Sequence, residues 1–223
     1  MKKLLNGIVE FRQTIRPHLI DKFQELAHTQ SPDALLIACA DSRVVPNLFA
    51  STDPGDLFVV RNVGNLVPPC NCAGNKENPY AEAAAIEFSL SNLPITNIIV
   101  CGHSSCAAMG AVLNGGVPAD KKFVNGWLEH GQNALKKLDH LDDFITNAPE
   151  TRQDQLSQLN VIHQLEHLMT YPQVKEKVDA GTLTLHGWWF DIAHANVYAY
   201  HKKDKEYVLI DEAETQRILD EAC

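Results

Sequence analysis

The sequence lacks an apolar run long enough to cross a membrane, and it lacks any large cluster of basic residues. The apolar stretch after Lys2 and Lys3 is interrupted by Asn6 and Glu10, which predicts neither a signal peptide nor a transmembrane helix. Lysine and arginine total 19 against 28 aspartates and glutamates, for a formal net charge of −9, and lysines gather only in pairs. Binding to nucleic acid or to an anionic membrane is therefore not expected.

Internal repeats and linker-like segments are also absent. With 223 residues, 45% of them hydrophobic, the chain can bury a full core, and we expect a single domain over residues 1–223. Without a secretion signal, its six cysteines favour a reducing compartment such as the cytoplasm, where cysteines more often bind metal, act in catalysis or lie buried than form disulfides. These cysteines are Cys39, Cys70, Cys72, Cys101, Cys106 and Cys223.

Strand-like and helix-like segments alternate along the chain. Apolar residues spaced by three or four over residues 3–28 predict an amphipathic helix with a kink near Pro17. The continuous apolar run 34–40 predicts a strand buried on both faces. The alternation predicts an α/β fold, with a mostly parallel central sheet flanked by helices and an N-terminal helical arm. Further strands are expected over 55–65, 96–103 and 205–211, and helices from about Pro79 to Leu93, after Cys106, and over most of 121–178.

Metal-binding residue types occur where two of the predicted strands end. Cys39 ends the first strand and is followed closely by Asp41 and Arg43, while His103 and Cys106 follow another strand. Functional side chains gather at the carboxyl edge of an open α/β sheet, so these groups are expected to lie together. A set of two cysteines and one histidine leaves the fourth position of tetrahedral zinc open for water, as in catalytic zinc sites. Two thiolates cancel the charge of Zn²⁺, so activity is expected to favour pH above neutral.

Each of these residues has a simpler interpretation when taken alone. Cys39 within an apolar run is ordinarily a small core residue, and Asp41 with Arg43 is compatible with a surface ion pair or a helix cap. Cys101, two residues before His103, would point to the same side of a strand and could compete as a ligand, although a buried thiol is favoured. The joint occurrence of these residues at two strand ends is what favours a metal centre.

Five segments resemble the β-class carbonic anhydrases: "CADSRV", "GHSSC", "GDLFVVRNVGNLVPP", "NVIHQLEHL" and "LTLHGWWFDI". The resemblance extends from about residue 5 to residue 210. It implies that Cys39, His103 and Cys106 bind Zn²⁺ and that zinc-bound hydroxide attacks carbon dioxide to give bicarbonate. It also implies that Asp41 and Arg43 form a pair beside the metal. Asp41 can accept a hydrogen bond from the hydroxide, while a bidentate Arg43 keeps the carboxylate off the cation.

The resemblance also assigns residues to the substrate pocket. Gln30 and Phe58 match the glutamine and phenylalanine of plant-like members, Phe88 stands where those members have tyrosine, and Gly102 is placed in the same pocket. Family members in which the aspartate closes the zinc carry a tryptophan three residues before the first cysteine ligand. Leu36 occupies that position here, so an open site is expected at neutral pH.

The resemblance further implies a homodimer or a higher homo-oligomer. The N-terminal helical arm, residues 1–30, would embrace the partner, which would allow Gln30 to serve the neighbour's zinc. Two rival functions are weighed against carbon dioxide hydration. One is another small cumulated substrate, such as carbon disulfide or carbonyl sulfide. The other is a zinc-stabilised scaffold or thiol redox sensor, which would have no need of Asp41 with Arg43.

Overall fold

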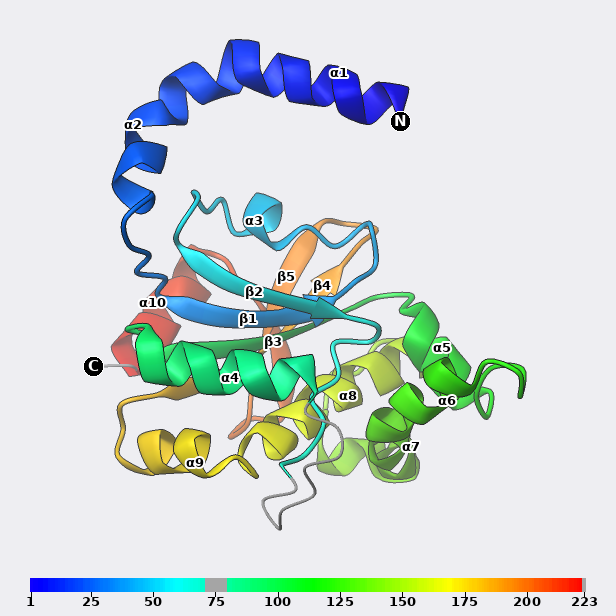
Figure 1. Ribbon diagram of the computed structural model, residues 1–223. Coiled ribbons are helices and arrows are strands. Elements are labelled where there is room, and N and C mark those ends of the chain that lie inside the picture. Colours follow the sequence, from blue (N-terminus) through cyan, green and yellow to red (C-terminus); the bar gives the residue numbers. More distant parts are fainter. Residues whose placement is uncertain (71–79, 222–223) are drawn as a thin grey trace.

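The computed structural model describes residues 1–70 and 80–221 of the chain. Its centre is a six-stranded sheet in the order β2-β1-β3-β4-β5-β6 (Figure 1). Pro79, Cys72 and Cys223 lie outside the described residues, so the expectations about them stay predictions. The strands are β1 (Ala34–Cys39), β2 (Leu57–Asn62), β3 (Asn97–His103), β4 (Thr184–Asp191), β5 (Asn196–His201) and β6 (Glu206–Leu209).

The sheet is parallel from β2 to β4 and antiparallel from β4 to β6. Every residue of β1 is buried, as are all residues of β3 after the first, which explains the unbroken apolar runs in the sequence. The mostly parallel α/β sheet is thus confirmed. Strands β4 and β5 were not expected from the periodicity; β4 continues the parallel part of the sheet, and β5 pairs antiparallel with both β4 and the expected strand β6.

Helices α4, α8 and α9 lie along one face of the sheet, and α5, α6 and α7 gather beyond the carboxyl ends of β1 and β3 (Figure 1). A short helix, α3, lies on the opposite side. Helix α8 starts where the Thr151 hydroxyl accepts a hydrogen bond from the Asp154 N–H at 3.1 Å. The bounds are α3 (Pro46–Phe49), α4 (Ala81–Asn92), α5 (Ala107–Leu113), α6 (Lys122–Leu128), η2 (Glu129–Gly131), α7 (Gln132–Lys137), η3 (Leu138–Asp143), α8 (Arg152–Leu168), α9 (Pro172–Asp179) and α10 (Glu212–Glu221).

The N-terminal arm extends away from the sheet and its helices (Figure 1). It consists of α1 (Lys2–Glu10), a π-helical segment η1 (Phe11–Ile15) and α2 (Arg16–Leu26), and none of its residues is buried. Near the kink expected at Pro17, the α-helix is interrupted by η1, which ends two residues before that proline. The helical arm is therefore confirmed, and its apolar stripe is exposed in the single chain.

Two further expectations concern the membrane and the cysteines. Among the described residues, no helix is both long and apolar enough to traverse a bilayer.

Cys39, Cys101 and Cys106 are free thiols, as expected, whereas Cys70 is disulfide-bonded. The expectation for Cys70 differed because it rested on the compartment alone and carried no information about which sulfurs lie close together.

Candidate metal centre

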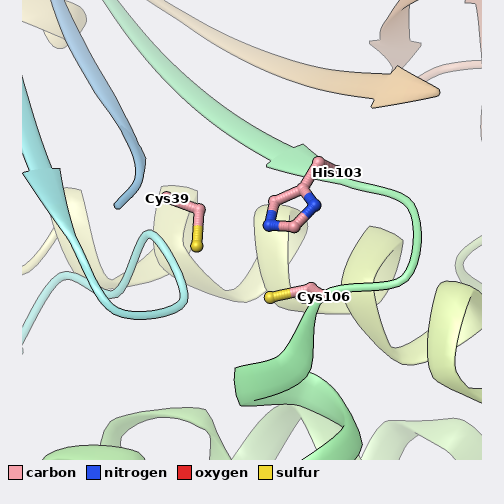
Figure 2. A group of neighbouring side chains, drawn as sticks. All are labelled: Cys39, His103 and Cys106. Atoms are coloured by element: carbon pink, nitrogen blue, oxygen red, sulfur yellow. The ribbon is translucent and has the colours of Figure 1, made fainter. Parts of the chain in front are cut away.

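Three side chains meet at the carboxyl edge of the sheet. Cys39 is the last residue of β1, His103 is the last residue of β3, and Cys106 directly precedes α5. All three are buried, and their potential ligand atoms lie within 4.8 Å of one another. Both sulfurs and the imidazole ring point toward a common centre (Figure 2). Within residues 1–70 and 80–221, this is the one such group of histidine, cysteine or acidic residues.

The hydrogen bonds of His103 fit a metal ligand. Its Nδ1 lies 2.9 Å from the carbonyl oxygen of Ser104, and a carbonyl can only accept, so Nδ1 carries the proton. The Nε2 atom is buried and has no hydrogen-bond partner. A buried nitrogen without a partner is costly, and a cation bound to its lone pair removes that cost.

The two thiols are unequal in acidity. A hydrogen bond from the Cys106 thiol lowers the pKa of Cys39 to about 4, against the opposing effect of burial. The same bond raises the pKa of Cys106. The pair therefore already favours one thiolate, and a divalent cation would favour the second by direct attraction. Sulfur, sulfur and imidazole nitrogen form a donor set suited to zinc.

Asp41 stands beside this group but is held by Arg43. Arg43 Nε and Nη2 donate to the two carboxylate oxygens at 2.9 and 2.7 Å, and the Arg43 backbone N–H donates at 3.0 Å. These hydrogen bonds hold the pKa of Asp41 well below its usual range. Its Oδ2 is 4.0 Å from His103 Nε2. The carboxylate is thus ionised, close to the metal-binding atoms and restrained by a bidentate partner.

The end of β2 and the loop that follows it support Cys39, a role that the sequence reasoning missed. Arg61 donates from Nε to the carbonyl of Cys39 at 3.1 Å and from Nη2 to that of Asp41 at 2.7 Å. The backbone N–H of Gly64 points at the Cys39 sulfur at 3.4 Å. Gly64 has a φ of +83°, and a Cβ there would lie 2.9 Å from that of Ala108, so this approach requires glycine. The sequence feature that could have predicted this support is "RNVGN", residues 61–65, at the end of the strand that pairs with β1.

Helix α8 holds the loop that carries His103 and Cys106 and also the loop that contains Gly64, a role that the sequence reasoning missed as well. Ser157 Oγ donates to the carbonyl of His103 at 2.7 Å, and Gln153 Nε2 donates to that of Cys106 at 2.8 Å. Asn160 Nδ2 donates to the carbonyl of Gly64 at 3.0 Å. The sequence shows these residues only as polar side chains at helical spacing. Such a pattern ordinarily indicates a solvent-exposed helix face, so it does not predict contacts with the metal-bearing loop.

Gly102 lies at a close contact between β3 and α8. A Cβ on this residue would lie 2.7 Å from Val161 Cγ2 and 3.3 Å from the carbonyl oxygen of Ser157. The structure therefore gives this glycine a packing role. Cys101 is fully buried, and burial raises the pKa of its thiol to about 12, so it is a poor source of a thiolate ligand.

The remaining pocket residues do not join the metal group within one chain. The rings of Phe58 and Phe88 stack with their centres 5.9 Å apart. Phe58 pairs with Leu35 in the parallel register, whereas Cys39 lies at the far end of β1. Gln30 is exposed between α2 and β1. Their assignment to a substrate pocket stays a prediction that involves a second chain.

Comparison with known proteins identifies the family. The family model described as "Carbonic anhydrase" matches residues 34–197. A carbonic anhydrase of Pseudomonas aeruginosa is 37% identical over 212 residues, covering 95% of this chain and 93% of that protein. Beta carbonic anhydrase 1 of Caenorhabditis elegans is 33% identical, covering 99% and 92%.

Solved structures agree with this similarity. The beta-carbonic anhydrase CcaA superposes with a TM-score of 0.82 at 35% identity, covering 95% of this chain and 92% of that one. A tetrameric beta-carbonic anhydrase of Sordaria macrospora gives a TM-score of 0.70 at 29% identity, covering 88% and 93%. The matched family region contains every residue of the metal group and the Asp41–Arg43 pair. The chain therefore belongs to the carbonic anhydrase family and is an enzyme of its β class.

Proposed function

We propose that this enzyme catalyses the zinc-dependent, reversible hydration of carbon dioxide to bicarbonate and a proton. Cys39, His103 and Cys106 would hold the zinc. The observation that carries the proposal is their convergence at the sheet edge, with the buried lone pair of His103 Nε2 left for a cation. When bound there, zinc supplies the Lewis acidity that makes hydroxide available as a nucleophile near neutral pH.

Asp41 and Arg43 would orient the reactants without binding the metal. The Asp41 carboxylate is an acceptor close to the ligand atoms, so it can take a hydrogen bond from the nucleophile and direct the oxygen lone pair at the substrate carbon. The bidentate bond from Arg43 restrains that carboxylate and supports a site that stays open at neutral pH.

The working unit is proposed to be a homodimer or a larger homo-oligomer. Residues 1–223 would form one domain whose arm, residues 1–30, packs against the partner. Support comes from the unburied arm and from the tetrameric relative. Gln30, Phe58 and Phe88 would then line a partner's substrate pocket together with its Gly102. A reducing compartment such as the cytoplasm would keep the ligand thiols reduced, whereas the disulfide of Cys70 is of a kind more common in oxidising compartments.

Stopped-flow measurement of the pH change after mixing with carbon dioxide tests the proposal. Hydration should rise from neutral to mildly alkaline pH and disappear on chelation of zinc. Cys39→Ser, His103→Ala and Cys106→Ser should lose zinc and activity together. Cys101→Ala, which removes a buried thiol outside the group, is the matched control and should keep both.

Two outcomes would contradict parts of the proposal. One zinc per chain without hydration at any pH would point to another cumulated substrate or to a scaffold. Asp41→Asn should retain zinc and lose most turnover, so unchanged turnover would remove Asp41 from the mechanism.

A further inference from the structure

The first turns of α8 face the loop that connects His103 to Cys106. Gln153 and Ser157 bind the carbonyl groups of Cys106 and His103, as described above. Between them, Asp154 Oδ1 accepts a hydrogen bond from the backbone N–H of Ser105 at 2.6 Å. Three side chains of one helix thus restrain three residues of the loop, and Asp154 is the one that contributes a carboxylate.

The Asp154–Ser105 contact begins a chain of hydrogen bonds that ends on Asp41. The carbonyl oxygen of Ser105 accepts from Arg43 Nη2 at 3.3 Å. The same Nη2 donates to Asp41 Oδ2 at 2.7 Å. Arg43 is therefore held from two sides, by the carboxylate that it restrains and by a backbone carbonyl of the metal-bearing loop.

The conformation of Ser105 explains why this loop needs an external restraint. Ser105 has a φ of +55°, in the left-handed region that side-chain-bearing residues seldom adopt. Its N–H faces α8 while its carbonyl faces Arg43. If Ser105 relaxed to a more common conformation, the carbonyl would turn away from Arg43. A strained backbone of this kind persists where its surroundings hold it in place, and the Asp154 carboxylate does so here.

We propose that Asp154 is a positioning residue that keeps the metal centre open by locking Ser105, and through it the grip of Arg43 on Asp41. This inference rests on the proposed zinc-dependent function. Asp154 is not one of the three residues of the metal group, and its carboxylate acts on the loop through the backbone N–H of Ser105. Its loss frees Arg43 on one side, and the Asp41 carboxylate can then move the short distance to the cation.

Asp154→Ala is the central variant. It should bind one zinc per chain, but X-ray absorption at neutral pH should show an added oxygen ligand in part of the sites. Turnover should fall about tenfold, as is common when the partner of a metal-site residue is removed. In zinc-stripped protein, the Ser105 amide should exchange with solvent faster than in the wild type. The Thr151 cap uses the backbone of residue 154, so it survives the substitution.

Three further variants separate positioning from general stability. Asp154→Asn keeps an oxygen acceptor and should stay near wild-type turnover and coordination. Ser105→Gly in the Asp154→Ala background should recover much of the lost turnover, because glycine adopts the left-handed region without strain. Gln155→Ala is the matched control. Gln155 lies in the same helical turn as Asp154 and donates a hydrogen bond to the carbonyl of Pro149, which the substitution removes. It should change neither the metal coordination nor the exchange rate of the Ser105 amide.

The possible failures are distinguishable. If the wild type binds no zinc or hydrates no carbon dioxide, the proposed function fails first. If the wild type is active and Asp154→Ala retains its coordination and turnover, the positioning role is refuted. Equal losses in Asp154→Asn and Asp154→Ala would also refute the backbone lock, since charge rather than the acceptor would then matter.

Discussion

Replacing Gly102 by alanine should destabilise the protein at the contact that seats His103. The added Cβ would lie 2.7 Å from Val161 Cγ2, closer than real Cβ contacts, so strand β3 and helix α8 must move apart. Overpacking of this kind costs about 1–3 kcal/mol. In a chain of this size, that corresponds to a fall in Tm of about 2–12 °C. Because Ser157 holds the His103 carbonyl across the same contact, zinc affinity should fall as well.

A double-mutant cycle with Val161→Ala tests the cause. Val161 is fully buried, so Val161→Ala alone should cost about 2 kcal/mol through lost apolar contact and a cavity. Val161→Ala removes both γ-methyl groups, and with Cγ2 it removes the clash with the methyl group that Gly102→Ala introduces. The double variant should therefore lose less than the sum of the single losses, by about 1 kcal/mol or more.

Urea unfolding of the zinc-stripped protein measures the loss of folding stability. The additional stability of the zinc-loaded protein reports the loss of zinc affinity. Gly126→Ala is the control, because no atom lies within 4 Å of a Cβ at that position in α6, and alanine should stabilise the helix slightly. Additive losses in the cycle, or no loss in Gly102→Ala, would refute the packing explanation. A stable Gly102→Ala with impaired substrate affinity would instead support its assignment to the substrate pocket.

Arg43→Ala should retain zinc, but Asp41 should bind it as a fourth protein ligand at neutral pH. An unchanged coordination by X-ray absorption would show that Arg43 is not what restrains Asp41. Arg61→Lys cannot make both carbonyl contacts, so it should weaken zinc affinity about 10- to 100-fold in competition with a chelator. Burial and the nearby charge of His163 lower the pKa of His167 from 6.5 to about 4. Between pH 6.5 and pH 4, the ring of His167 is more often protonated in the unfolded chain than in the folded protein. Lowering the pH through this interval therefore favours unfolding, and the stability present above pH 6.5 is lost toward pH 4. Over that interval, the unfolding free energy of the wild type should fall by up to about 3 kcal/mol more than that of His167→Gln; equal slopes would contradict this.

The metal group could be anticipated because its residues end continuous apolar runs. Strands β1 and β3 are buried on both faces, and a run of that kind ends visibly when it reaches the loop at the sheet edge. Cys39 and His103 occupy those two ends. The sequence therefore indicated both the strands and the proximity of their terminal side chains, without any knowledge of how the helices pack.

Strands β4 and β5 could not be anticipated in the same way. Gly187 interrupts the apolar pattern of β4, and the structure shows that a Cβ there would lie 3.0 Å from Val161 Cγ1. Val161 thus packs between two strand glycines, Gly102 and Gly187. That requirement comes from the position of α8, which no local pattern encodes.

The polar face of α8 was hidden for a related reason. Ser157, Asn160 and Gln164 are buried, yet their composition suggests a face turned to water. They are buried because loop backbone groups satisfy them, and those partners are distant in sequence. For Phe58 and Phe88, the missing information is the position of a second chain.

The exposed arm also affects how the folding of this enzyme depends on protein concentration. Helices α1 and α2 bury no residue, and Leu4 and Ile8 are each 64% exposed. Most helical stability in proteins comes from packing of an apolar face, so we expect the arm to be stabilised mainly by contact with another surface. If that surface is a second copy, dilution should melt the arm while the sheet remains folded, and part of the helical circular dichroism signal should disappear before any tertiary signal does.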